Sequence, residues 1–205
     1  MWQQGEQRVE TPTIRAVRRR QILEVARAVV IEGGLGALTF GALERRVSFT
    51  RGVITHHFAN KRAIVQALLD EAVSEIDHAT ALQVPETGHA ADRLLGALQA
   101  MVRGFVAHPD AARVLVSFWG GQGADVIAME KNAALFSRFR AQCADILRLG
   151  QTRGEIRAEL DVDSTSAVVV GLVIGLVAQT LFEEEAIDVE AAVAAAAEGV
   201  ILAAC

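Results

Sequence analysis

The apolar residues of this chain recur with a helical period, and this pattern restricts the fold more than any other feature of the sequence. Between positions 22 and 30, one helical face collects Ile22, Val25, Ala26, Val29 and Val30. Comparable stripes lie at about 64–76, 90–107, 110–119, 124–152, 163–184 and 188–204. No alternating strand pattern of useful length accompanies them. The sequence therefore predicts an all-α fold.

Glycine and proline residues divide these helices into two groups. Gly33 and Gly34 predict the end of the first helix, because glycine tolerates left-handed backbone conformations. Pro85 and Gly88 interrupt the helical pattern, so a domain boundary is predicted near them. The predicted order is a flexible arm at 1–12, a three-helix domain at 13–58, a connecting helix at 59–84 and a larger helical domain at 85–205.

Two short helices joined by a tight turn are predicted at 39–46 and 51–57, and these are the dimensions of a helix-turn-helix. Thr39 and Thr50 are the expected N-caps, and Asn60 is expected to cap the helix that follows. The positions expected to face outward are Thr50, Arg51, Gly52, Thr55, His56 and His57.

Positive charge is concentrated at the front of the chain. Residues 1–70 carry 11 Lys and Arg against 6 Asp and Glu, whereas the remaining residues carry 9 against 19. Arg15, Arg18 and Arg19 lie in the opening turns of the first helix, and Lys61 begins the fourth. Because cations near a helix N-terminus are normally unfavourable, such clusters indicate an external anion. A nucleic-acid phosphate backbone would supply one.

The stretch LTFGALERRVSFTRGVITHHFANKRAIVQALL resembles the DNA-binding segment of TetR-type transcriptional repressors, and the resemblance covers about residues 14–76. It implies an N-terminal three-helix helix-turn-helix DNA-binding domain and a C-terminal helical bundle for dimerisation and ligand binding. Each subunit of a homodimer would place its 51–57 helix in a major groove of double-stranded DNA. Two-fold symmetry then implies a palindromic operator.

The resemblance also implies DNA contacts for single residues. The family positions that hold phosphates are matched by Thr39, Thr55, His57 and Lys61. Those that face bases are matched by Thr50, Arg51, Val53 and His56. Arg51 could fork onto guanine, and Gly52 would let a groove wall approach closely. Arg15, Arg18 and Arg19 complete the expected DNA-binding set on electrostatic grounds.

Three positions depart from the family pattern. Glu44 stands where a small residue is usual, Ser48 where the turn glycine is usual, and Thr55 where tyrosine is common. Ser48 would be strained by about 1 kcal/mol if the turn had to be left-handed. We expect these departures to alter the operator sequence rather than the fold.

The C-terminal part resembles the choline-responsive repressors of betaine synthesis more loosely, through FWGGQGADVIAMEKNAALFSRFRAQ and GEIRAELDVDSTSAVVVGLVIGL. The resemblance implies a small-molecule effector, and a quaternary ammonium ion would favour aromatic faces. Aromatic residues at helical spacing are also typical of a hydrophobic core. The candidate ligand-binding residues are Met101, Phe105, Phe118, Trp119, Gln122, Phe136, Phe139 and Gln179.

The run AVVVGLVIGLVAQTLF at 167–182 is apolar on all sides. It is shorter than the roughly 20 residues that span a bilayer, and it contains Gln179 and Thr180. We therefore expect a subunit interface and no membrane segment, with close helix approach at Gly171 and Gly175. The candidate interface residues are Val169, Leu172, Val173, Leu176, Val177, Ala194, Ala197 and Ile201.

Two other classes of function compete with an effector-released repressor. Glu75 with His78, and Glu86 with His89, have the Glu-x-x-His spacing of di-iron helical enzymes, although two further carboxylates are not evident. A constitutive DNA-binding protein without an effector is the other alternative. We expect no enzyme, no catalytic residue, no metal and no cofactor. The lack of a secretory signal and the two cysteines favour the cytoplasm.

Overall fold

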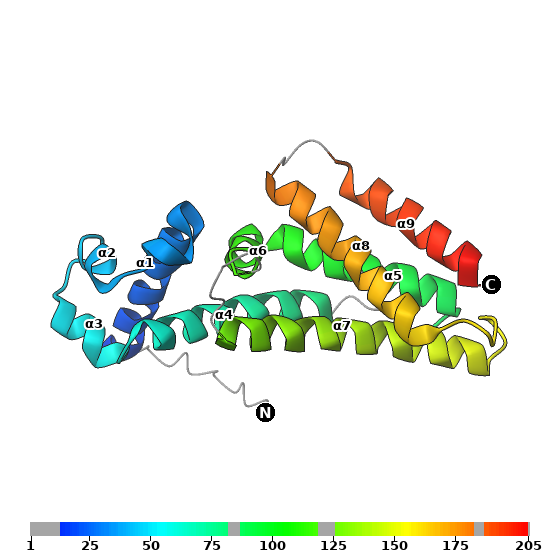
Figure 1. The fold of residues 1–205 in the computed structure, drawn as a ribbon, viewed down its shortest axis with the longest axis horizontal. Helices are drawn as coiled ribbons and strands as arrows, with labels where there is room; N and C mark the ends of the chain where they lie inside the picture. The colour runs from blue at the N-terminus through cyan, green and yellow to red at the C-terminus, as the bar shows by residue number, and fades with distance from the viewer. Residues whose placement is uncertain (1–12, 82–86, 119–125, 183–186, 205) are drawn as a thin grey trace, which may run out of the picture. The chain divides into compact units, whose positions relative to one another are not determined.

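The computed structural model describes residues 13–81, 87–118, 126–182 and 187–204, and every regular element in them is a helix (Figure 1). The prediction of an all-α fold is confirmed. In chain order the helices are α1 (Ile14–Ala37), α2 (Phe40–Glu44), α3 (Arg51–His57), α4 (Lys61–Ala81), α5 (Ala90–Ala107), α6 (Pro109–Val116), α7 (Val126–Thr152), α8 (Val162–Phe182) and α9 (Val189–Ala204).

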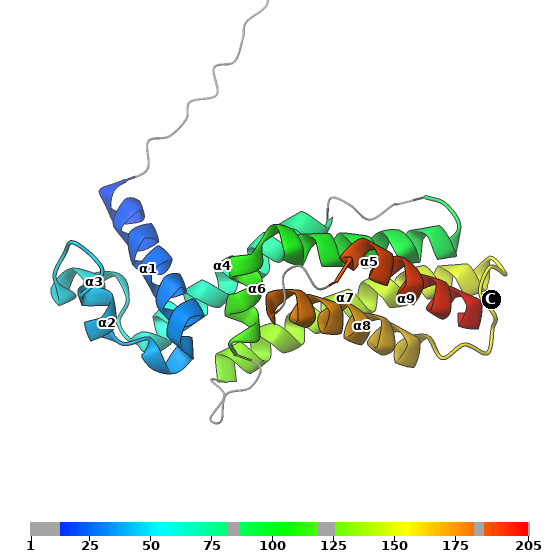
Figure 2. The same ribbon diagram turned by 90° about the horizontal axis from the view of Figure 1, so that it is seen from above.

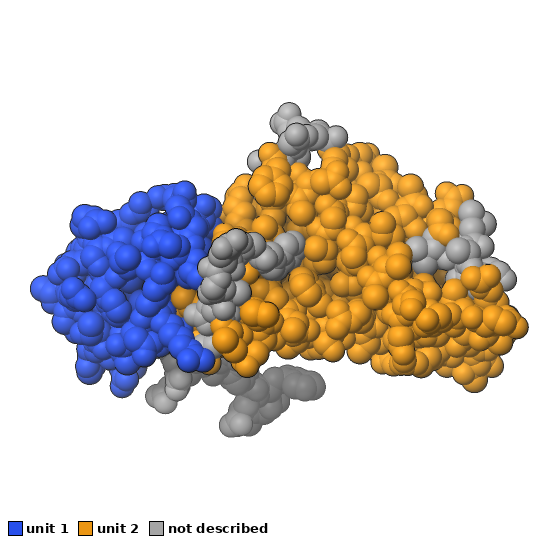
Figure 3. All heavy atoms as spheres, in the orientation of Figure 1, with its two compact units in different colours: residues 1–64 blue, residues 65–205 orange. Residues whose placement is uncertain are grey.

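The chain forms two compact units, Met1–Ile64 and Val65–Cys205 (Figure 3). The division falls inside α4 rather than near Pro85. Most of the helix that was predicted to connect the domains is therefore part of the second unit. The helix-turn-helix segment lies entirely within the first unit.

Local signals in the sequence set the helix ends of the first unit. The Thr13 hydroxyl accepts a hydrogen bond from Ala16 N at 3.2 Å, and Thr39 Oγ1 accepts one from Ala42 N at 3.1 Å. Gly34 has a φ of 69° and interrupts α1, as the glycine pattern predicted. The buried residues of this unit are Ile22, Leu23, Ala26, Val29, Val30, Leu38, Leu43, Ile54, Phe58 and Ile64.

The second unit is built around α5, which packs against α6, α7, α8 and α9 (Figures 1 and 2). α5 presents a continuous buried face that includes Leu94, Leu98 and Phe105. Close packing on α4 is possible because position 104 is glycine, where a Cβ would lie 2.7 Å from Thr80 Cγ2. α4 and α7 run side by side in the same direction, and ion pairs join Asp70 to Lys131 and Asp77 to Arg138 (Figure 1).

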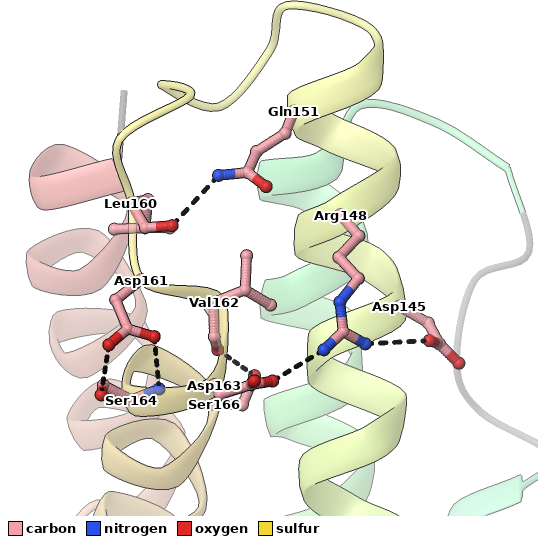
Figure 4. Close-up of polar contacts among 9 residues, drawn as sticks. All are labelled: Asp145, Arg148, Gln151, Leu160, Asp161, Val162, Asp163, Ser164 and Ser166. Atoms are coloured by element: carbon pink, nitrogen blue, oxygen red, sulfur yellow. Dashed lines mark hydrogen bonds and ion pairs between the residues drawn. The ribbon is translucent and has the colours of Figure 1, made fainter.

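A polar network fixes the connection between α7 and α8 (Figure 4). The Gln151 side-chain amide donates to the carbonyl oxygens of Arg157, Ala158 and Leu160 at 3.1, 3.2 and 3.1 Å. Arg148 bridges Asp145 and Asp163, while Asp161 accepts hydrogen bonds from the backbone and hydroxyl of Ser164. These contacts set the direction in which α8 leaves the turn.

The candidate interface residues differ in how exposed they are within one subunit. Four of the candidate residues, Val169, Val173, Val177 and Ala197, are at most 1% exposed because they pack inside the second unit. Leu172, Leu176 and Ala194 remain at least partly exposed, whereas the side chain of Ile201 lies outside the described residues. The run at 167–182 is thus not buried on all sides by its own subunit.

The outer face of α8 is apolar and open. Val168 is 58% exposed, Leu172 39% and Phe182 81%, although α8 is otherwise a core helix. Among the described residues, α8 is the one helix long and apolar enough to cross a bilayer. Its inner face packs on α5, α6, α7 and α9, as in the core helix of a globular protein.

Gln151→Ala should lower the free energy of unfolding by about 1–2 kcal/mol, because three carbonyl groups lose a shared donor and regain only water. Thermal melting of purified protein measures the change. Gln66→Ala, at an exposed position of α4, is the matched control and should melt like the wild type. Equal melting temperatures for both variants would show that the α7–α8 network adds nothing to stability.

Candidate nucleic-acid interface

α3 is anchored by two buried residues and exposes the rest of its surface. Ile54 and Phe58 pack into the first unit, with 0% and 2% of their surface exposed. The spacing of these anchors turns the predicted DNA-facing residues away from the core. Exposed are Thr50, Arg51, Gly52, Thr55 and His56, while Val53 and His57 are half-buried.

The arginines at the start of α1 lie beside α3. Arg18 lies over the ring of Phe49 at 5.6 Å, and Arg19 lies over the ring of Phe58 at 4.7 Å. Phe49 immediately precedes the α3 cap and Phe58 follows α3. These cation–π contacts therefore hold both guanidinium groups next to the exposed face of α3. The structure thus brings together residues that are more than thirty positions apart in the sequence.

The pKa of His57 depends on its burial and on the basic side chains around it. Its pKa is lowered from the ordinary value of 6.5 by partial burial first, and then by His56, Arg15, Arg18 and Arg19. Four cationic or titratable neighbours from two helices therefore act on one imidazole. A nearby phosphate would offset their repulsion.

Lys61 has a structural contact that the sequence did not indicate. Its Nζ donates to Leu35 O at 2.7 Å, and so satisfies a carbonyl beyond the Gly34 break. The ammonium group has three donors, so two remain for another acceptor. Asn60 caps α4 as predicted, since its Oδ1 accepts from Ala63 N at 2.9 Å.

Acidic side chains are few among the described residues of the first unit. Residues 13–64 contain ten Lys and Arg but only three Glu. Glu24 pairs with Arg20 at 3.5 Å and Glu32 with Arg46 at 2.6 Å. No acidic residue lies in the first turn of α1, α2, α3 or α4. Within residues 13–64, the starts of α1 and α4 therefore carry basic side chains without an acidic residue in the same turn.

The third glutamate, Glu44, caps α3 in place of the expected Thr50 side chain. Thr50 occupies the N-cap position of α3, but its hydroxyl makes no cap hydrogen bond. Instead, Glu44 Oε1 accepts from Arg51 N at 3.1 Å. The Thr55 hydroxyl donates to Gly52 O at 3.1 Å, one turn earlier on α3. Among the described residues no non-glycine has a positive φ, so Ser48 avoids the left-handed strain considered above.

The predicted ligand-binding residues that the structure describes differ in their burial. Met101, Phe105, Phe118 and Phe139 are buried in the second unit, with Phe105 and Phe139 in edge-to-face contact at 6.2 Å. Gln179 is exposed and donates to Gly175 O, away from the core. Phe136 is half-buried. Trp119 and Gln122 lie outside the described residues.

Hollows do occur in the second unit. A pocket of about 110 Å³ has Phe105, Arg113 and Thr180 in its lining. A wider hollow of about 510 Å³, open to solvent between α4 and α7, is lined by Asp77, Thr80, Arg138, Phe139, Ala141, Gln142 and Asp145.

The described residues contain neither a cluster of metal ligands nor a readily ionised thiol. No group of three His, Cys, Asp or Glu among them could hold a metal ion. Glu75 Oε2 lies 3.9 Å from His108 Nδ1, and no metal site with His78 is present among the described residues. Glu86, of the second Glu-x-x-His pair, lies outside the described residues. Burial raises the pKa of the Cys143 thiol to about 12, which disfavours the reactive thiolate.

Comparison with known proteins supports the interpretation of both units. Residues 22–68 match the family described as bacterial regulatory proteins, tetR family, and residues 90–201 match the BetI-type transcriptional repressor C-terminal family. The HTH-type transcriptional regulator BetI of Cronobacter sakazakii is 23% identical over 105 residues, or 50% of this chain. The alignment spans 52% of that relative.

Solved structures share the fold over nearly the whole chain. A putative transcriptional regulator from Saccharomonospora viridis in complex with choline has a TM-score of 0.73 at 19% identity, covering 91% of this chain and 96% of that one. The transcriptional regulator FadR from Bacillus subtilis in complex with stearoyl-CoA has a TM-score of 0.72 at 18% identity, covering 89% and 97%. At these identities the likeness concerns the fold.

Duplex DNA should raise the pKa of His57, because phosphates favour the imidazolium form that the neighbouring cations disfavour. Binding then takes up a proton, so affinity should rise as the pH falls between the higher pKa of the complex and the lower pKa of the free protein. An NMR titration of the imidazole with and without duplex measures the shift. His78, in the second unit, is the control, and an unchanged pKa for His57 would remove it from the phosphate contacts.

Proposed function

This chain belongs to the TetR family of bacterial regulatory proteins, and from that premise we propose that it is a cytoplasmic repressor which a small-molecule effector releases from a palindromic operator. The single observation that carries the proposal is the basic surface that α3 and the starts of α1 and α4 form in the described part of the first unit. A constitutive DNA-binding protein would need that surface but no effector site. A regulator of this family is not expected to be an enzyme.

Phosphate contacts would orient α3 in a major groove. Arg15, Arg18 and Arg19 from α1, Thr39 at the start of α2, and Lys61 at the start of α4 flank α3 within the first unit. His57 joins them from the last turn of α3, whereas the Thr55 hydroxyl contributes less because it already donates to Gly52 O. The base-facing set is then Thr50, Arg51, Val53 and His56, with Gly52 allowing close approach.

A homodimer would bury the outer faces of α8 and α9. The exposed apolar side chains of Val168 and Leu172 flank Gly171, a position where an added Cβ would meet nothing within the subunit. Exposed apolar surface of this kind typically marks an interface. A symmetric pair of subunits would present two α3 helices, which is what a palindromic operator requires.

The effector is proposed to bind in the second unit, and an organic cation is the chemistry favoured by the solvent-open hollow between α4 and α7. Asp77 and Asp145 line that hollow beside Phe139, and each carboxylate is paired with an arginine, Asp77 with Arg138 and Asp145 with Arg148. The aromatic ring of Phe139 is the group there that favours a cation. An effector must bind the DNA-free shape more tightly than the DNA-bound one to act as an inducer.

The experiment that tests the function is selection of bound fragments from random duplex DNA, followed by release with organic cations. Enrichment of one palindromic sequence supports a sequence-specific regulator, and release by a cation supports the effector class. Enrichment without release by any tested metabolite would favour the constitutive alternative. Absence of any enriched sequence would contradict the proposal.

Arg51→Ala should weaken binding to the selected operator by about 1–3 kcal/mol while changing binding to random duplex much less, because a base contact is lost. Competition binding at fixed salt measures both affinities. Arg140→Ala, at an exposed position of α7, is the matched control. An equal loss of operator and random-duplex affinity would show that Arg51 contacts only phosphate.

Lys61→Gln should weaken operator and random-duplex binding together and reduce the slope of log K against log salt by about one per subunit. Glutamine keeps a donor for Leu35 O while the charge is lost. The slope is measured by titration at several salt concentrations. If it keeps the wild-type value, Lys61 serves only to hold Leu35.

Leu172→Glu should convert the dimer into a folded monomer and lower operator affinity, since a charge would enter the proposed apolar interface. Leu149→Glu, at an equally exposed position of α7, should leave the dimer intact. Sedimentation reports assembly, and circular dichroism reports folding. A dimeric Leu172→Glu protein would refute this interface.

A further inference from the structure

Phe40 and Glu44 lie one turn apart on α2 and hold Arg51 at two points. The Glu44 carboxylate accepts a hydrogen bond from the Arg51 backbone N–H at 3.1 Å. The Arg51 guanidinium lies over the Phe40 ring at 5.6 Å. Residues four apart on a helix share a face, so one side of α2 supports both the backbone and the side chain of Arg51. Arg51 and the Glu44 carboxylate are thereby fixed next to each other.

The Glu44 carboxylate has no cationic partner within the described part of the first unit, unlike Glu24 and Glu32, which pair with arginines. The residue is exposed, and the hydrogen bond to Arg51 N uses only one of its two oxygens. The other oxygen can accept further hydrogen bonds. On a surface that meets DNA, such a charge weakens binding to every duplex unless the DNA offers it a donor.

Base edges in the major groove differ in the donors that they offer. Cytosine presents its N4 amino group, which suits a carboxylate, while guanine presents O6 and N7, which suit a guanidinium. A single C·G pair therefore offers a donor and two acceptors side by side. Glu44 and Arg51 together present the complementary pair of groups in adjacent positions.

We propose that Glu44 is a specificity-determining residue that accepts a hydrogen bond from the N4 amino group of an operator cytosine, beside the guanine bound by Arg51. This inference rests on the proposed function, because it requires the start of α3 to face the major groove. It gives a chemical role to a glutamate at a position where the family pattern has a small residue.

Selection from random duplex DNA by wild-type and Glu44→Gln proteins tests the proposal. Glutamine can still accept from Arg51 N, but its amide suits the N6 and N7 edge of adenine. The wild type should prefer cytosine at one half-site position, and the variant should shift that preference towards adenine by at least about fivefold. Glu24→Gln, a neutralised carboxylate on α1, is the matched control and should keep the wild-type preference.

A second arm keeps the wild-type protein and changes the DNA. Replacing the selected C·G pair by T·A should weaken wild-type binding by at least about fivefold, whereas Glu44→Ala should no longer distinguish the two duplexes. Unchanged base preferences in both Glu44 variants would overturn the proposal. If the wild type selected no sequence at all, the proposed function would fail instead, so the two failures are distinguishable.

Discussion

Repulsion among like charges is the constraint on which the function of this protein depends. Ten Lys and Arg side chains share residues 13–64 with three glutamates, and the starts of α1 and α4 carry several of them. Burial lowers the pKa of His57 most, and His56 and three arginines of α1 lower it further. Only an external polyanion relieves this repulsion for several groups at once. The described part of the first unit thus presents a basic surface that suits a polyanion.

The second unit meets a different requirement, because it must cover apolar surface rather than charge. α5 provides a central buried face, and the α7–α8 network directs α8 so that one side packs inward. The opposite side of α8 stays apolar and open. Within the described residues, the first unit therefore has more basic than acidic side chains, and the second unit leaves the outer apolar face of α8 exposed. DNA and a second subunit are the partners that would bind these surfaces.

Periodicity and local signals predicted the helices well, since the stripes, the Gly34 break and the caps at Thr39 and Asn60 depend on neighbouring residues. Contacts between distant residues could not be predicted in this way. The Lys61 bond to Leu35 and the cap that Glu44 supplies to α3 both depend on how α1, α2 and α3 pack. The burial of Val169, Val173 and Val177 inside their own subunit could not be predicted for the same reason. An all-apolar run does not reveal which of its faces its own subunit covers.

Amide hydrogen exchange of the protein with and without a selected operator duplex tests the basic surface most directly. We expect the operator duplex to slow amide exchange at the starts of α1 and α4 and along α3, with no change in the α7–α8 connection. Protection confined to the second unit, with residues 13–20 and 50–63 unaffected, would contradict it.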